Sequence, residues 1–98
     1  MGIVSFADRG TENVFDGVSS KVARRVCPQT LWAVARRKLE QLNAVTRLDD
    51  LRFPPNNRLE ALRGDRRGQH SIRINDQYRV CFTWTPSGPA GVEIVDYH

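Results

Sequence analysis

The segment Arg58–Trp84 has the sequence RLEALRGDRRGQHSIRINDQYRVCFTW, and its residue pattern predicts strands rather than a helix. Polar and apolar side chains alternate over Ser71–Ile74 and again over Tyr78–Trp84, with the turn residues Asn75-Asp76 between them. Alternation bounded by Asn, Asp and Gly is typical of antiparallel strands. Because successive side chains of a strand point to opposite faces, Arg79 is expected to point away from the face that carries the aromatic residues.

Arginine is concentrated in this segment. Across the chain, 15 Lys and Arg residues stand against 11 Asp and Glu residues, which gives a formal net charge of +4. This balance favours an anionic partner, nucleic acid being the commonest, although a basic protein without such a partner has the same composition. The planar guanidinium suits bidentate contacts with phosphate. The arginines of the segment that the pattern places on or beside strands are Arg63, Arg66, Arg67, Arg73 and Arg79.

The N-terminal part predicts a strand followed by a short helix. Ile3–Phe6 is a β-prone run, expected to be the first strand. Asp8 is a good helix N-cap, and Thr11–Phe15 is expected to form a short helix that Gly17 ends. Val18–Cys27 is polar and basic with weak periodicity, so a loop and a helical turn both remain open.

Pro28–Val45 has the strongest helical pattern in the chain, because proline suits a first helical turn and apolar residues then recur at helical spacing. This apolar stripe is expected to pack on the sheet. Phe53–Asn57 is expected to be a loop, since its two prolines and two asparagines suit neither a helix nor a central strand. The stripe consists of Leu31, Val34 or Ala35, Leu39 and Leu42.

These elements predict one α+β domain over residues 1–98. Pro86–Gly91 is a turn, and Val92–His98 is the last strand. The order strand, helix, helix and then about four strands indicates an antiparallel-rich sheet of about five strands, with two N-terminal helices on one face. The first strand must join this sheet, in the simplest case parallel to the last strand.

Several function classes are disfavoured. Cys27 and Cys81 have no metal-binding spacing, so we expect neither a metal nor another cofactor. The N-terminus lacks the basic and apolar regions of a signal peptide, and position six is Phe6, which does not fit a myristoylation motif. No apolar run approaches transmembrane length. A cytoplasmic protein with reduced cysteines is therefore expected.

Three motifs together resemble a known family. They are Leu62–Gly68 (LRGDRRG), Ser71–Arg79 (SIRINDQYR) and the closing Asp96–His98 (DYH). In combination they resemble the HigB branch of the RelE-like toxins, also called plasmid maintenance killer proteins, over essentially the whole chain. The resemblance implies a β-α-α-β-β-β-β fold.

The resemblance also implies a function and partners. Toxins of this family belong to type II toxin–antitoxin pairs, enter the ribosomal A site and cut the mRNA being translated. A HigA-like antitoxin with a helix-turn-helix domain neutralises them, and operator DNA is bound only through the antitoxin. No membrane is involved.

Metal-free RNA cleavage needs a base, an acid and positive charge, because the 2′-hydroxyl attacks the adjacent phosphate. Arg79 matches the arginine of the family motif and is the candidate for stabilising charge. His98 is the candidate for proton transfer, since its imidazole titrates near neutrality. Tyr97 is expected to stack on a base or to position the phosphate, and Asp96 to orient His98 or Arg79.

Two positions depart from the family pattern. Arg63 stands where relatives often have lysine just before Gly-Asp, and arginine holds phosphate but cannot shuttle a proton. Glu60 stands where some relatives carry histidine, and it is a candidate base if it faces the site. Both departures suggest a slower enzyme. Arg66, Arg67 and Arg73 are expected to grip RNA backbone and to give salt-sensitive binding.

Two other functions remain open at this stage. One is a weak or non-catalytic basic module that binds RNA or acts only as the co-repressor partner of a HigA-like antitoxin. The other, a nuclease acting on free RNA, is less favoured because the sequence lacks a paired-histidine set.

Overall fold

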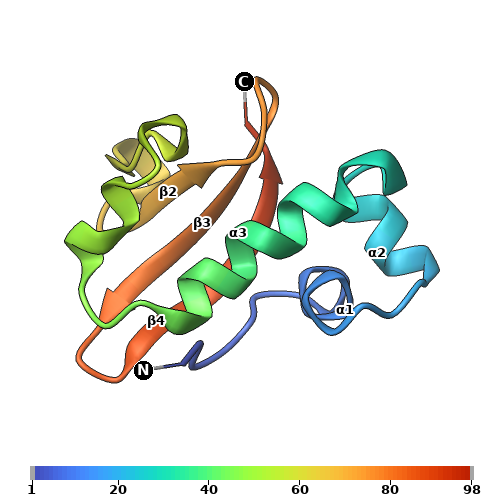
Figure 1. Ribbon diagram of the computed structural model, residues 1–98, viewed down its shortest axis with the longest axis horizontal. Coiled ribbons are helices and arrows are strands. Elements are labelled where there is room, and N and C mark those ends of the chain that lie inside the picture. Colours follow the sequence, from blue (N-terminus) through green and yellow to red (C-terminus); the bar gives the residue numbers. More distant parts are fainter. Residues whose placement is uncertain (1, 98) are drawn as a thin grey trace.

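The structure is a computed structural model and describes residues 2–97. A four-stranded antiparallel sheet with strand order β1-β2-β3-β4 forms one layer, and three α-helices precede it in the chain (Figure 1). The α+β prediction is therefore confirmed. The elements are α1 (Arg9–Asp16), α2 (Lys21–Val26), α3 (Trp32–Ala44), β1 (Glu60–Ala61), β2 (His70–Arg73), β3 (Tyr78–Thr85) and β4 (Gly88–Asp96).

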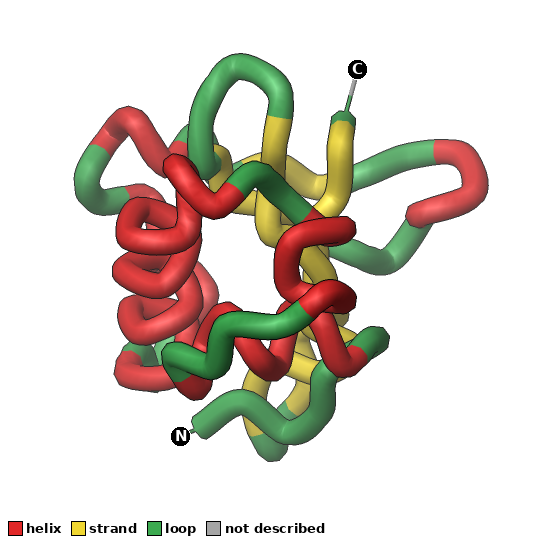
Figure 2. Tube along the Cα trace, turned by 90° about the vertical axis from the view of Figure 1, so that its right-hand side faces the viewer, coloured by secondary structure: helices red, strands yellow, loops and turns green. Residues whose placement is uncertain are grey.

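Helix α3 lies across one face of the sheet (Figure 1), and the hydrophobic core fills the space between them. In Figure 2 a helical coil stands on one side of the strands, and a loop with a short helical turn projects on the other side. The predicted apolar stripe of α3 is confirmed at Ala35, Leu39 and Leu42, which are fully buried. They pack in one cluster with buried sheet residues such as Val80 and Phe82.

The predicted caps of α1 are both confirmed. Asp8 Oδ1 accepts a hydrogen bond of 2.6 Å from the Thr11 backbone N–H, and Gly17 ends the helix with a left-handed φ of 76°. The fully buried Thr11 hydroxyl in turn accepts a 3.0 Å hydrogen bond from the Ile94 N–H. The same turn of helix that Asp8 caps is thus fixed to β4.

The prediction of a regular strand over Ile3–Phe6 is wrong, and the sheet has four strands rather than about five. This segment makes one isolated parallel bridge, between Phe6 and Val92, with a 3.0 Å hydrogen bond from the Val92 N–H to the Ser5 carbonyl. The parallel direction is as expected. The pairing stays short because the chain turns away at Asp8 to start α1.

Two helical predictions change as well. The open segment 18–27 contains α2, whose N-cap Ser20 Oγ accepts a 3.1 Å hydrogen bond from the Ala23 N–H. The single helix expected over Pro28–Val45 is shorter, since a 3₁₀ turn at Gln29–Leu31 precedes α3. Residues 2–97 contain three α-helices instead of two, because extended backbone at Cys27 and Pro28 separates α2 from α3.

Strand β3 has the predicted alternation, but both of its faces are covered. Val80 and Phe82 are fully buried in the core, as expected. On the opposite face Cys81 is also fully buried and Arg79 is 8% exposed. Arg79 is therefore held inside the protein rather than displayed on an open surface.

Among the described residues, no helix is long and apolar enough to cross a membrane.

Candidate functional site

Arg79 is fixed on the face of the sheet opposite α3. Its Nη1 donates a 2.6 Å hydrogen bond to the buried Ser71 Oγ on β2. Its Nη2 lies 3.1 Å from Glu60 Oε1 on β1 and 3.4 Å from the Arg58 carbonyl oxygen. Contacts to β2 and to β1 orient the guanidinium, so the Arg79 side chain has little conformational entropy left to lose when it binds a ligand.

Tyr97 lies beside Arg79. The Arg79 Cζ is 6.0 Å from the centroid of the Tyr97 ring, the distance of a cation–π contact. The chain end is held there by a 2.7 Å hydrogen bond from the Tyr97 N–H to the Gln77 carbonyl. Arg79 and the C-terminal segment therefore share one side of the molecule, which the sequence-based account of the site requires.

A depression of about 590 Å³ opens next to this pair. It is lined by Glu60 and Arg63 from β1 and the residues after it, together with Tyr97. Arg63 also lines a neighbouring depression of about 370 Å³ that Arg67 closes from the loop after β1. The Arg63 and Arg67 side chains are exposed, and neither forms an ion pair within residues 2–97. Both guanidiniums are thus available to a phosphate.

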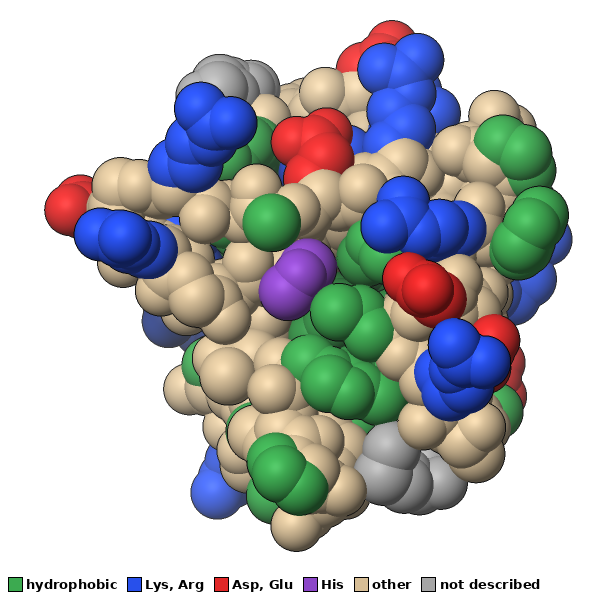
Figure 3. All heavy atoms as spheres, turned by 90° about the vertical axis from the view of Figure 1, so that its left-hand side faces the viewer, with side chains coloured by type: hydrophobic (Ala, Val, Ile, Leu, Met, Phe, Trp, Pro, Cys, Tyr) green, Lys and Arg blue, Asp and Glu red, His purple; other side chains and the backbone are tan. Residues whose placement is uncertain are grey.

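Arg66 and Arg73, which were predicted to grip RNA with Arg67, already have carboxylate partners. Arg66 Nη1 lies 3.2 Å from Glu93 Oε1, and Arg73 is bonded to Asp76. On the face that Figure 3 displays, Lys and Arg side chains lie beside Asp and Glu side chains. Of the three arginines, Arg67 is therefore the most accessible to RNA.

The Asp96 carboxylate lies away from Arg79 by the alternation of β4. Asp96 pairs with Tyr78 across the strands, whereas Arg79 pairs with Val95. Asp96 Oδ2 accepts a 3.1 Å hydrogen bond from Gln77 Nε2. Asp96 therefore lies on the other face of β4 from Arg79, and its role in orienting His98 or Arg79 stays a prediction. The predicted proton-transfer residue, His98, lies outside the described residues.

Glu60 lies on the site face, which was the condition for its candidate role as a base. Its side chain is 54% exposed and lines the depression, and its Oε1 lies 3.1 Å from Arg79 Nη2. Arg79 is largely buried and Glu60 is more than half exposed, so the glutamate is the partner that can move aside. An incoming phosphate would replace one negative partner of the buried guanidinium by another.

Ser71 is the positioning residue that sequence reasoning missed. It belongs to the Ser71–Arg79 motif, but nothing in that motif assigns it a role. The only signal in the sequence is that alternation places Ser71 on the same face of the strand as Arg73, two residues later. Its position opposite Cys81, two residues along the strands from the Arg73–Arg79 pair, places its hydroxyl on the same face as the guanidinium and within hydrogen-bond distance of it.

Neither cysteine is suited to act as a nucleophile. Burial raises the pKa of the Cys27 thiol from 9.0 to about 11. Burial also raises the pKa of Cys81, against the opposing effect of Arg66. Both thiols are free and buried. Within residues 2–97, no three His, Cys, Asp or Glu side chains are grouped closely enough to hold a metal ion.

Comparison with known proteins identifies the family. A family model described as the RelE-like toxin of the type II toxin–antitoxin system HigB matches residues 4–98. The chain belongs to this family. It is similar to the toxin HigB-1 of Vibrio cholerae, with 38% identity over 81 residues, which span 83% of this chain and 82% of that protein. It is also 40% identical over 57 residues to an uncharacterized protein of Haemophilus influenzae, spanning 58% of this chain and 56% of that protein.

As a RelE-like toxin, the chain is one half of a type II toxin–antitoxin pair, and an antitoxin is its partner. RelE-like toxins are in general endoribonucleases. The buried arginine, the aromatic ring above it and the two free arginines at the depression are a set of groups suited to binding a phosphodiester.

Proposed function

We propose that this toxin is a ribosome-dependent mRNA endoribonuclease that cleaves without a metal ion, by attack of a ribose 2′-hydroxyl on the adjacent phosphate. The observation that carries the proposal is the Arg79 guanidinium, held by Ser71 and Glu60 beneath the Tyr97 ring at the edge of the depression. Fixed donors aimed at a phosphate stabilise the charge that develops during attack, and they need no reorganisation.

The proposed cleavage is an intramolecular transfer of the phosphoryl group from the 5′-oxygen to the 2′-oxygen. The 2′-oxygen forms a bond to phosphorus while the bond from phosphorus to the 5′-oxygen breaks, which leaves a 2′,3′-cyclic phosphate and a 5′-hydroxyl. The 2′-hydroxyl proton passes to a base and the leaving 5′-oxygen receives a proton from an acid. Glu60 is the candidate base on this face, and His98 remains the candidate acid. Arg63 contributes charge but no proton.

The proposed partners follow from this activity. The toxin binds the A site of translating ribosomes together with mRNA, and it therefore acts in the cytoplasm. A HigA-like antitoxin with a helix-turn-helix domain neutralises it, and operator DNA is contacted only through that antitoxin. Arg63 and Arg67, both without an ion-pair partner in the described part of the chain, are the side chains best placed to give salt-sensitive RNA binding.

The test is to add the protein to a translating extract and to map mRNA ends. New ends that carry a cyclic phosphate and appear only on translated message are expected. They should disappear with Arg79→Ala and after removal of Tyr97-His98, but not with Arg24→Ala, which removes an exposed arginine of α2. Cleavage that survives both changes in folded protein would overturn the site assignment.

Two observations favour a second function. The Arg79 guanidinium already has a carboxylate partner in Glu60, and the lysine common at position 63 is an arginine here. A weak or non-catalytic RNA-binding toxin or co-repressor partner fits these features. It predicts ribosome association or antitoxin binding with no new mRNA ends in the same extract.

A further inference from the structure

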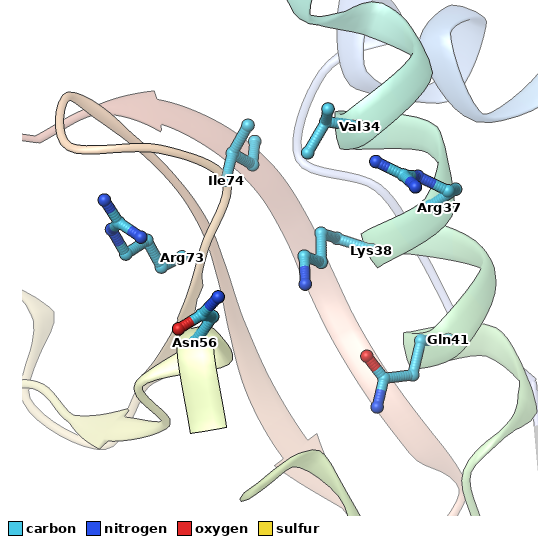
Figure 4. A pocket seen from close by; sticks show the side chains of 7 residues that line it. All are labelled: Val34, Arg37, Lys38, Gln41, Asn56, Arg73 and Ile74. Atoms are coloured by element: carbon cyan, nitrogen blue, oxygen red, sulfur yellow. The ribbon is translucent and has the colours of Figure 1, made fainter. Parts of the chain in front are cut away.

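A second basic concavity lies on the other side of the sheet edge. A groove of about 310 Å³ separates α3 from β2 (Figure 4). In Figure 4 the Arg37 and Lys38 side chains extend from α3 toward the strands, and Asn56 and Arg73 lie across from them. Three of its seven lining side chains are cationic, two are amides and two are aliphatic.

The side chains of Arg37 and Lys38 and the stem of Arg73 line this groove, and no carboxylate is among its lining residues. The pKa of Lys38 is lowered, first by burial and then by the charges of Arg37 and Arg73. The Lys38 ammonium is held by a 2.6 Å hydrogen bond to Asn57 Oδ1, and Asn57 is itself fully buried. A bound anion would relieve the repulsion between these cations, since it adds the opposite charge that the groove lacks.

The groove is connected to the candidate site through one cross-strand pair. Arg73 on β2 lies directly opposite Arg79 on β3, so their Cα atoms are about 5 Å apart. Figure 4 shows the Arg73 guanidinium turned away from α3, while its stem lines the groove. The Asp76 carboxylate that pairs with Arg73 is 97% exposed and is easily replaced by another anion.

We propose that the groove between α3 and β2 binds a backbone phosphate of the RNA strand whose scissile phosphate lies at Arg79. This proposal rests on the proposed function and adds Arg37, Lys38 and Arg73 to the RNA-binding surface. A ribose-phosphate backbone fits better than an acidic protein segment. The cationic residues run from α3 round the sheet edge to Arg79, which matches the repeated phosphates of one RNA strand. The groove lining has only two aliphatic side chains, so a peptide would bury little apolar surface there.

The experiment measures binding of a short single-stranded 2′-O-methyl RNA, which lacks the attacking hydroxyl, over a range of salt concentrations. The variant Arg37→Gln/Arg73→Gln keeps the Lys38–Asn57 bond. The matched control Arg24→Gln/Arg25→Gln removes the same charge from exposed positions of α2. The groove variant should bind about tenfold or more weakly than the control, because charge-assisted hydrogen bonds are lost. Its slope of log K against log salt should fall by about 0.7 for each phosphate contact removed.

A second binding measurement, with vacant 70S ribosomes, distinguishes mRNA from ribosomal RNA as the source of the phosphate. A loss on the free oligonucleotide assigns the groove to the mRNA strand and supports the proposal, whereas a loss on ribosomes alone assigns the groove to ribosomal RNA and overturns it. Equal affinities of the two variants in both measurements, at equal melting temperatures, would overturn it. So would weaker antitoxin binding with unchanged RNA binding, which would assign the groove to the protein partner. A wild-type protein that cuts no mRNA but still shows the groove effect would refute the proposed activity alone.

Discussion

The Glu60 carboxylate and a substrate phosphate compete for the same N–H donors of Arg79. Glu60 Oε1 lies 3.1 Å from Arg79 Nη2, where a phosphate oxygen would accept a hydrogen bond. Glu60 is mostly exposed and Arg79 is mostly buried, so the glutamate is the partner that moves. The pair therefore limits how readily phosphate reaches the arginine.

Glu60→Gln separates the two roles of this residue. If Glu60 only occupies Arg79, the variant should bind 2′-O-methyl RNA several-fold more tightly and cleave at least as fast as the wild type. If Glu60 is the base, single-turnover cleavage should fall by about 10²-fold or more. Rates and affinities measured on the same preparation decide between them, and Glu40→Gln on the exposed surface of α3 is the control.

Cys27 makes stability depend on alkaline pH. Its folded pKa is raised from 9.0 to about 11, so its contribution to stability is complete below pH 9 and is lost as the pH rises toward 11. The free energy of unfolding should fall between pH 9 and pH 11, and Cys27→Ala should show a smaller fall. Equal losses in both proteins would contradict the assignment.

Iodoacetamide at pH 8 should label neither thiol without unfolding, because both are buried.

At the level of secondary structure, local sequence patterns predict the elements that have clear residue alternation or clear helix caps. Period-two alternation located β2 and β3, and Asp8 and Gly17 located both ends of α1. Helix α2 has only six residues and weak periodicity, so its existence depends on packing against α1 that no local pattern reveals. The segment Ile3–Phe6 has strand-forming residues, yet only its neighbour β4 determines how far it pairs.

The cap of α1 gives a prediction at this scale. Asp8→Ala removes the 2.6 Å hydrogen bond to the Thr11 N–H and should cost about 1 kcal/mol of stability. Denaturant unfolding measures this loss. Asp16→Ala at the other end of the same helix is the control and should be neutral or slightly stabilising, because an acidic side chain is unfavourable at a helix C-terminus. Equal losses in both variants would show that Asp8 does not act as a cap.

At the scale of the whole molecule, the site depends on the pairing register between strands, which the sequence does not reveal. Alternation placed Arg79 on the face away from the core, and the closing motif indicated that the chain end would join it. The contacts from Ser71 and Glu60 arise because Glu60 pairs with Ser71, and Ser71 with Cys81, across three strands. The groove beside Arg73 likewise requires α3 to pack on the sheet at β3 and β4 and to stand apart from β2, a tertiary arrangement that no single segment encodes.

The most direct test of the central claim is single-turnover cleavage on purified ribosomes carrying a defined mRNA, with Arg79→Ala, Arg79→Lys and Arg24→Ala compared at saturating protein. Loss of fixed charge at the phosphate should slow Arg79→Ala by about 10²–10³-fold, with partial activity in Arg79→Lys and wild-type rates in Arg24→Ala. Wild-type rates in a folded Arg79→Ala protein would contradict the claim that Arg79 holds the phosphate being cleaved.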